Sequence, residues 1–168
     1  YMEQLRLALP HAKIINFEDE GTGAVLADLV FNALYEDAAS PNVRAGDPYF
    51  IASKLFLIYN PIVVRDHVKD IFIGFGGADP QNYTDRLLRI IDHPAYHHYQ
   101  FHVVIGRAKH NAERLLTYNS RNHIEILYDI DNMPEVMSKC DIAITSRGRT
   151  GYELALLGLP TIAMAQNE

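Results

Sequence analysis

A polar turn between two apolar runs carries the side chains best suited to chemistry in this sequence. The turn 145-TSRGRTG-151 follows the apolar run 141-DIAI-144 and opens a stretch of helical character. Free backbone N–H groups at a helix start, hydroxyl groups and guanidinium groups all favour an anion such as phosphate. The groups that could serve here are Ser146, Arg147, Gly148, Arg149 and Thr150.

Glu153 lies one helical turn inside the same stretch. A carboxylate at this position could accept hydrogen bonds from the two vicinal hydroxyls of a ribose. The alternative is that Glu153 only complements the helix dipole while the nearby arginines are solvated.

A second glycine-rich turn, 74-GFGGADP-80, follows the apolar run 70-DIFI-73. Its glycines would let backbone N–H groups approach a ligand, and the sequence predicts a helix from about Pro80 with Asp79 as its N-cap. The pattern is not GxGxxG and no acidic residue ends the next strand, which argues against a dehydrogenase. Either the turn serves chain geometry alone, or both turns bind one ligand at the carboxyl ends of their strands.

Three other features are better explained by structure than by chemistry. The histidine-rich stretch 93-HPAYHHYQFH-102 lacks a carboxylate or cysteine to complete a metal site and is interpreted as a solvated loop. The acidic run 16-NFEDEGTG-23 is interpreted in the same way. Cys140, at the end of a predicted helix, is expected to be a small buried apolar residue rather than a nucleophile.

These turns are positioned by a repeated pattern of a short apolar run, a turn and a helical stretch. The pattern predicts an α/β fold with a Rossmann-like, doubly wound parallel sheet. The predicted strands are 70–75, 101–106, 124–130, 141–145 and 160–164, and the helices between them are 80–92, 110–120, 131–140 and 149–158.

The first part of the chain is less regular. A helix over 2–9 and strands over 13–17 and 28–34 are expected, with loops around residues 19–23 and 40–48. Three regions are predicted: residues 1–60 are the tail of a preceding α/β domain, 61–69 form a linker, and 70–168 form a truncated nucleotide-binding domain. Tyr1 and the final run 163-AMAQNE-168 suggest a fragment of a longer polypeptide.

Composition excludes several classes of protein. The 168 residues include 15 Lys and Arg against 21 Asp and Glu, a net charge of −6, and the basic residues form no stripe, which argues against nucleic-acid binding. The single cysteine excludes an internal disulfide framework. No apolar run reaches the roughly 20 residues that span a bilayer. The sequence therefore predicts a soluble, cytoplasmic protein.

In combination, these residues resemble a known group of enzymes. The segments 72-FIGFGGADPQN-82, 103-VVIGRA-108 and 124–168 are similar to the C-terminal half of GT-B nucleotide-sugar enzymes. The nearest resemblance is to the UDP-sugar hydrolase of pseudaminic acid biosynthesis and to spore-coat polysaccharide biosynthesis proteins. A more distant one is to the N-acetylglucosaminyltransferase of the peptidoglycan lipid precursor.

The resemblance implies a UDP-sugar site and assigns residues to it. Backbone groups of one turn would face the diphosphate, the segment 128-YDIDNM-133 would hold the uracil, and the second turn would face phosphate. The matching positions are Gly76, Gly77 and Ala78 for the first turn, Tyr128, Ile130 and Met133 for the base, and Ser146, Gly148, Thr150 and Glu153 for phosphate and ribose. Gln166 and Asn167 match a sugar-facing pair. Ala78 stands where relatives often have serine.

The resemblance leaves the reaction open. The glycine-rich loop that holds the catalytic base in the hydrolases has no counterpart here, so the catalytic residues are unknown. No cofactor or metal is required, because helix N-termini and arginines can neutralise a diphosphate. The chain is expected to belong to a UDP-sugar hydrolase or glycosyltransferase in surface polysaccharide or nonulosonic acid biosynthesis. The alternatives are a UDP-sugar 2-epimerase and a non-catalytic sugar-nucleotide module fused to a cytidylyltransferase.

Overall fold

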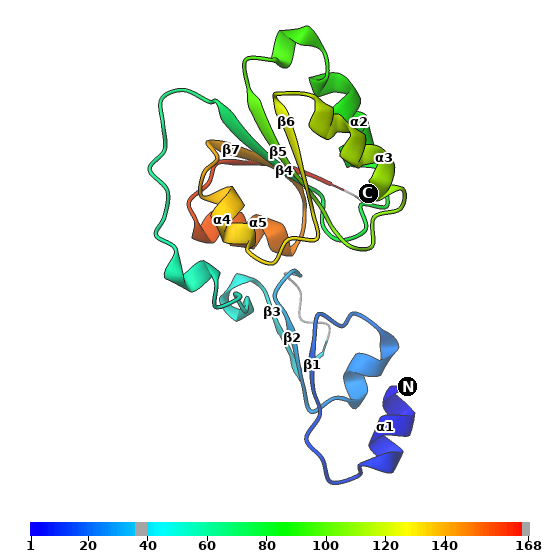
Figure 1. Cartoon of the computed structure of the whole chain (residues 1–168). Helices are drawn as coiled ribbons and strands as arrows, with labels where there is room; N and C mark the ends of the chain where they lie inside the picture. Colours follow the sequence, from blue (N-terminus) through cyan, green and yellow to red (C-terminus); the bar gives the residue numbers. More distant parts are fainter. Residues whose placement is uncertain (36–39, 166–168) are drawn as a thin grey trace. The chain divides into compact units, whose positions relative to one another are not determined.

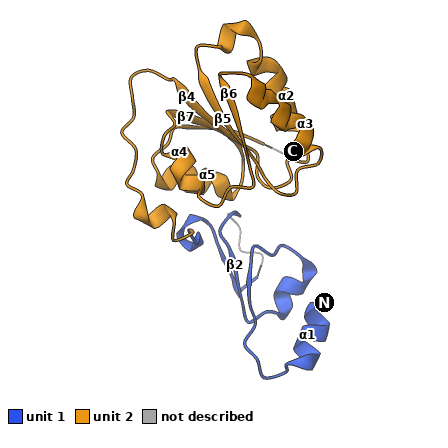
Figure 2. Ribbon diagram, viewed as in Figure 1, with its two compact units in different colours: residues 1–52 blue, residues 53–168 orange. Residues whose placement is uncertain are grey.

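The chain forms two compact units, residues 1–52 and 53–168, in a computed structural model that describes residues 1–35 and 40–165 (Figure 2). Each unit contains a parallel sheet with interspersed helices, so the fold is α/β and Rossmann-like. The fold class predicted from the strand and helix alternation is therefore confirmed.

The first unit is built on a small parallel sheet with the order β1-β2-β3. Its elements are α1 (Met2–Ala8), β1 (Ile15–Phe17), η1 (Thr22–Leu26), β2 (Leu29–Asn32), β3 (Val43–Ala45) and η2 (Asp47–Tyr49). Strand β3 lies where the sequence predicted a loop. Val43 is buried and pairs with the fully buried Val30. The three residues of β3 include the charged Arg44 and are enclosed by turn residues, so no apolar run marks this strand in the sequence.

The second unit contains a five-stranded parallel sheet with the order β6-β5-β4-β7-β8. Its strands are β4 (Asp70–Gly74), β5 (Gln100–Ile105), β6 (Ile124–Tyr128), β7 (Ile142–Ser146) and β8 (Thr161–Met164). Its α-helices are α2 (Tyr83–Ile91), α3 (Ala112–Leu116), α4 (Met133–Met137) and α5 (Arg149–Leu156). Short 3₁₀ turns are η3 (Phe56–Ile58), η4 (Pro94–Tyr96) and η5 (Thr117–Ser120). All five predicted strands are confirmed.

Helices cover both faces of this sheet, with α2 and α3 on one side and α4 and α5 on the other (Figure 1). Alternate residues of the central strand β4 divide between the two layers. Ile71 and Ile73 pack in the cluster that contains Leu88 of α2, and Phe72 packs in the cluster that contains Leu154 of α5. Burial on both faces explains why the strands are apolar throughout rather than alternating.

The first compact unit ends at Ala52 and the second begins at Ser53. Phe56 is buried in the same cluster as Phe72, and the Ile62 N–H donates to the Leu157 carbonyl at 2.8 Å. The Arg65 guanidinium donates to the Lys139 carbonyl at 2.9 Å. The segment expected to end one domain and link it to the next therefore packs on the second unit.

Candidate functional site

The strand order places the two glycine-rich turns next to each other. From β4 the chain adds β5 and then β6 on one side of the sheet, and it then returns to the other side of β4 to form β7. The direction in which successive strands are added to the sheet therefore reverses between β4 and β7. Gly74 at the end of β4 is paired with Thr145, whose Oγ1 donates to the Gly74 carbonyl at 2.6 Å. Ligands of doubly wound sheets bind outside the carboxyl ends of the strands at such a reversal point.

The first turn presents backbone rather than side chains. Gly76, Gly77 and Ala78 are exposed, and Gly76 has φ +80°, a conformation that favours glycine. A Cβ added to Gly77 would meet no described atom within 4 Å. The geometry of the protein therefore demands glycine at position 76, whereas the open space beside Gly77 is available to a ligand.

Asp79 occupies the helix start that follows this turn. Helix α2 begins at Tyr83, three residues later than predicted, because Asp79 and Asn82 both have positive φ and extend the turn. The Asp79 carboxylate accepts the backbone N–H groups of Tyr83 at 2.9 Å and Thr84 at 3.0 Å. The N-cap residue is Asn82 rather than the predicted Asp79, but the Asp79 carboxylate accepts the first N–H groups of the helix. Its negative charge makes this N-terminus less suited to a further anion.

Helix α5 differs from α2 at its N-terminus. Its N-cap is Gly148, and no side-chain cap is formed there. Ser146 is buried, Thr150 is half-buried, and Arg147 and Arg149 are exposed. Gly148 is extended, and a Cβ at this position would meet nothing within 4 Å among the described residues. Of the two helix starts beside the reversal point, α5 is the one suited to an anion.

Glu153 is half-buried on the first turns of α5. Burial raises the pKa of its carboxyl above the ordinary value, and the positive charge of Arg149 opposes that shift. No hydrogen bond or ion pair joins the carboxylate to another residue in the described part of the chain. A partly desolvated carboxylate in this situation gains from any ligand that donates hydrogen bonds to it.

The segment 128–133, predicted to hold the uracil base, contains both an exposed side chain and side chains that pack against the core. Tyr128 is 44% exposed and its hydroxyl donates to the Arg107 carbonyl at 3.4 Å. Ile130 and Met133 instead pack against the apolar cluster beneath α4 and α5. The predicted sugar-facing residues, Gln166 and Asn167, lie outside the described residues.

Sequence reasoning missed two residues behind the first turn, Gly106 and Lys109. A Cβ on Gly106 would come within 2.4 Å of the Gly77 Cα, so the two backbones touch. The Lys109 side chain is 1% exposed and forms an ion pair with Asp79 at 3.0 Å. A third glycine directly after a strand, in 103-VVIGRAKHN-111, was the available signal for this contact.

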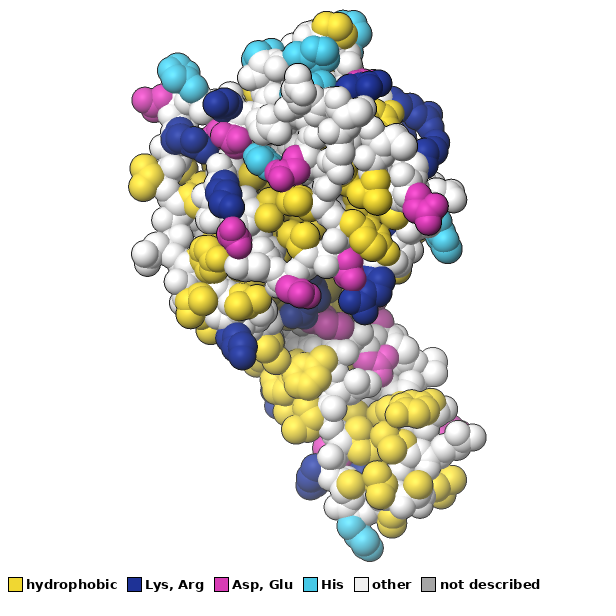
Figure 3. Space-filling model, viewed as in Figure 1, with side chains coloured by type: hydrophobic (Ala, Val, Ile, Leu, Met, Phe, Trp, Pro, Cys, Tyr) yellow, Lys and Arg dark blue, Asp and Glu magenta, His cyan; other side chains and the backbone are white. Residues whose placement is uncertain are grey.

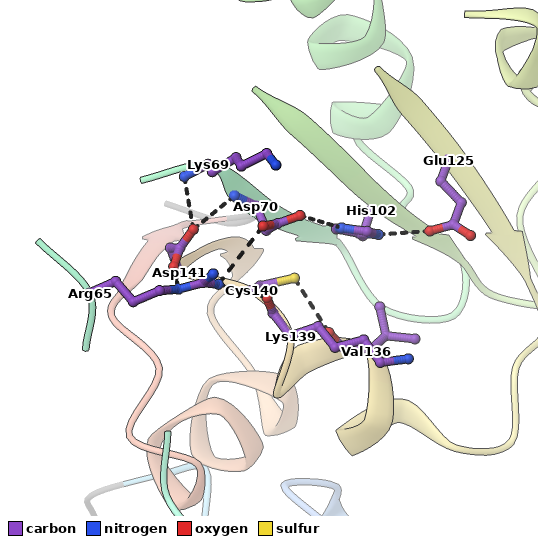
Figure 4. A network of polar contacts seen from close by, with 9 residues as sticks. All are labelled: Arg65, Lys69, Asp70, His102, Glu125, Val136, Lys139, Cys140 and Asp141. Atoms are coloured by element: carbon purple, nitrogen blue, oxygen red, sulfur yellow. Dashed lines mark hydrogen bonds and ion pairs between the residues drawn. The ribbon is translucent and has the colours of Figure 1, made fainter. Parts of the chain in front are cut away.

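A separate charged network lies at the amino ends of the strands, at the opposite edge of the sheet (Figure 4). The His102 ring lies between Asp70, at 3.1 Å from Nε2, and Glu125, at 2.7 Å from Nδ1. These residues lie on adjacent strands, so the network ties β4, β5 and β6 together. His102 is therefore a strand residue with two partners rather than part of a solvated loop.

The other histidines of that stretch are exposed, namely His93, His97 and His98. Histidine side chains lie on the surface at the top of the view in Figure 3, over the η4 turn. The described residues contain no group of three or more His, Cys, Asp or Glu that could hold a metal ion. Within residues 1–35 and 40–165, no helix has the length and apolar character needed to cross a membrane.

Cys140 is buried beside this network, as expected for a small apolar residue. Its Sγ donates to the Val136 carbonyl at 3.4 Å. Burial, together with the nearby carboxylates of Asp70 and Asp141, raises the pKa of the thiol to about 12. The reactive thiolate is therefore scarce at neutral pH.

We expect Cys140 to resist alkylation in the folded protein. Iodoacetamide at about pH 8 should leave Cys140 unmodified, because the reagent cannot reach the buried sulfur and little of the thiol is ionised. The same reagent should label it fully in guanidinium chloride, as measured by intact mass. Rapid labelling under native conditions would contradict both the burial and the raised pKa.

Comparison with known proteins supports the fold. No protein-family model matches the chain. The uncharacterized protein MJ1062 of Methanocaldococcus jannaschii is 27% identical over 168 residues, covering 95% of this chain and 34% of that protein. The crystal structure of TarM, a GT-B glycosyltransferase, aligns with a TM-score of 0.52 and 11% identity over 83% of this chain and 30% of TarM. The chain thus spans about a third of either protein, and its α/β fold is similar to that of the aligned part of TarM.

Proposed function

We propose that the second unit binds a nucleotide sugar, with UDP as its nucleotide, at the carboxyl edge between β4 and β7. The pairing of β4 with β7 carries the proposal, because it brings two exposed glycine-rich turns to one place in the sheet. The proposed nucleotide contacts are the residues predicted from the resemblance, with the α5 helix start preferred over the α2 start for phosphate. The proposed sugar-facing residues remain Gln166 and Asn167.

The chemistry that these residues can supply is leaving-group stabilisation. Cleavage of the bond between sugar and diphosphate leaves negative charge on UDP. Backbone N–H groups at Gly148 and at the Gly77 turn would donate hydrogen bonds to the charged diphosphate, and they are already in position before the reaction. Glu153 would hold the ribose through its two hydroxyls and so fix the position of the diphosphate. The proposed reaction is hydrolysis or glycosyl transfer in the cytoplasmic synthesis of surface polysaccharides or nonulosonic acids, and the catalytic base is not assigned.

A titration with UDP tests this proposal. Glu153→Ala should weaken UDP binding by at least about tenfold, since two hydrogen bonds to a charged acceptor are lost. It should also abolish the preference of the wild-type protein for UDP over 2′-deoxy-UDP. Glu3→Ala is the matched control, because Glu3 is an exposed glutamate on α1 of the first unit.

Isothermal titration calorimetry measures the UDP affinity of the wild type, of Glu153→Ala and of the control variant. No UDP binding by the wild-type protein would refute the proposal, and unchanged binding by Glu153→Ala would refute the site assignment. The raised pKa adds a second check. An ionised Glu153 is needed to accept both hydroxyls, so UDP affinity should fall on acidification at a higher pH than an ordinary glutamate would give.

A further inference from the structure

A buried lysine lies directly behind the first glycine turn. The Lys109 side chain is 1% exposed, and its Nζ reaches three oxygens on the turn and on α2. It lies 3.0 Å from Asp79 Oδ2, 2.7 Å from Asn82 Oδ1 and 2.9 Å from Asp85 Oδ2. Arg114 contacts the other oxygen of Asp85, so two cations balance two carboxylates in this cluster.

The turn that Lys109 contacts is conformationally costly. Gly76, Asp79 and Asn82 all have positive φ, and two of them are not glycine. Such residues persist only where surrounding contacts hold them, at a cost of order 1–3 kcal/mol each. Lys109 bonds both of the non-glycine residues, and Gly106, three residues before it, touches the Gly77 backbone. The loop after β5 therefore holds the turn after β4 from behind.

We propose that Lys109 is a positioning residue for the diphosphate subsite. It tethers Asp79 and Asn82, so that the backbone of residues 76–78 stays open toward the ligand, and it does not itself touch the nucleotide. This role rests on the proposed function and deepens it. It also explains why a lysine is buried here, since the two carboxylates beside it satisfy its charge.

The test uses two variants and two ligands. Lys109→Met removes the tether but leaves a buried carboxylate unbalanced, which could prevent folding. The double variant Asp85→Asn/Lys109→Met removes the tether and keeps the charge of the cluster balanced, and it leaves the Asp79 carboxylate to accept the Tyr83 and Thr84 N–H groups. UDP and uridine are titrated into each protein, because only UDP carries the diphosphate that the turn is proposed to contact.

We expect the double variant to bind uridine like the wild type and UDP about tenfold more weakly. In the free protein, amide hydrogen exchange should accelerate at residues 76–82 and stay slow in β4, a result that requires no nucleotide. A role in overall stability alone would lower the affinity for both ligands together. A role in charge balance alone would return wild-type UDP affinity in the double variant.

The failures of the two proposals are distinguishable. If the wild-type protein does not bind UDP, the proposed function is wrong. If it binds UDP and the ratio of UDP to uridine affinity is unchanged in the double variant, only the role of Lys109 is wrong. Unchanged hydrogen exchange at residues 76–82 in the double variant would likewise overturn the tether.

Discussion

Replacing Gly106 by alanine is expected to destabilise the second unit by about 2–3 kcal/mol, as overpacking of fixed backbone does. The new Cβ would lie 2.4 Å from the Gly77 Cα and 2.6 Å from the Gly77 carbonyl oxygen. Neither atom can rotate away, so the loop after β5 and the turn after β4 must separate by roughly 1 Å to reach van der Waals distance. Urea unfolding measures the loss, and UDP affinity should fall with it.

Gly77→Ala is the matched control on the other side of the same contact. Its Cβ would meet no described atom within 4 Å, so the free energy of unfolding should change by less than about 0.5 kcal/mol. The same methyl group would project into the space proposed for the diphosphate and should weaken UDP binding at least about tenfold. Equal stability losses in the two variants would contradict the geometry. Full UDP affinity in Gly77→Ala would show that the diphosphate does not contact this turn.

Gly77 and Gly106 show which parts of the structure could be predicted from the sequence and which could not. The apolar runs predicted all five strands of the second sheet, and the buried strands β4 and β5 leave the clearest signal because they are covered on both faces. The two glycine-rich turns were expected at the carboxyl ends of their strands, but the order of the strands comes only from the structure. The glycine after β5 was a signal of close backbone approach at Gly106, but Gly77 could not be identified as its partner, since periodicity carries no information on how two loops pack.

The errors have the same origin. The sequence placed Asp79 at a helix start but could not show that the chain takes positive φ there and at Asn82. Nor could it pair Asp79 with Lys109, 30 residues later, because a buried ion pair between loops leaves no local pattern. Consequently the sequence could not distinguish the helix start that the protein fills with its own carboxylate from the one at α5, which has no such cap. The short strand β3 was missed because its three residues include the charged Arg44 and lie among the turn residues Pro41, Asn42 and Gly46, whereas β1, equally short, lies in a longer apolar run.

Away from the candidate site, Asp141→Ala is expected to cause the largest loss of unfolding free energy. The Asp141 side chain is 2% exposed, and its Oδ2 accepts the backbone N–H groups of Lys69 and Asp70, each at 2.8 Å. Its other oxygen contacts the Arg65 guanidinium (Figure 4). Alanine would leave two partly buried N–H groups without their acceptor and remove the nearest carboxylate of Arg65, which should cost about 3 kcal/mol of unfolding free energy. Asp66→Ala, at an exposed neighbouring position, is the control.

The effect of Asp141 should also depend on pH. Burial alone would raise the pKa of this carboxyl, but the two backbone donors and Arg65 outweigh burial and hold the pKa below its ordinary value. A depressed folded-state pKa means that the stabilisation is complete above the unfolded value of about 3.9 and is lost as pH falls through the folded value. The stability gap between wild type and Asp141→Asn, from urea unfolding, should therefore be constant above about pH 5 and shrink in more acidic solution. A gap that instead widened on acidification would show that the carboxylate is strained rather than stabilised by its donors.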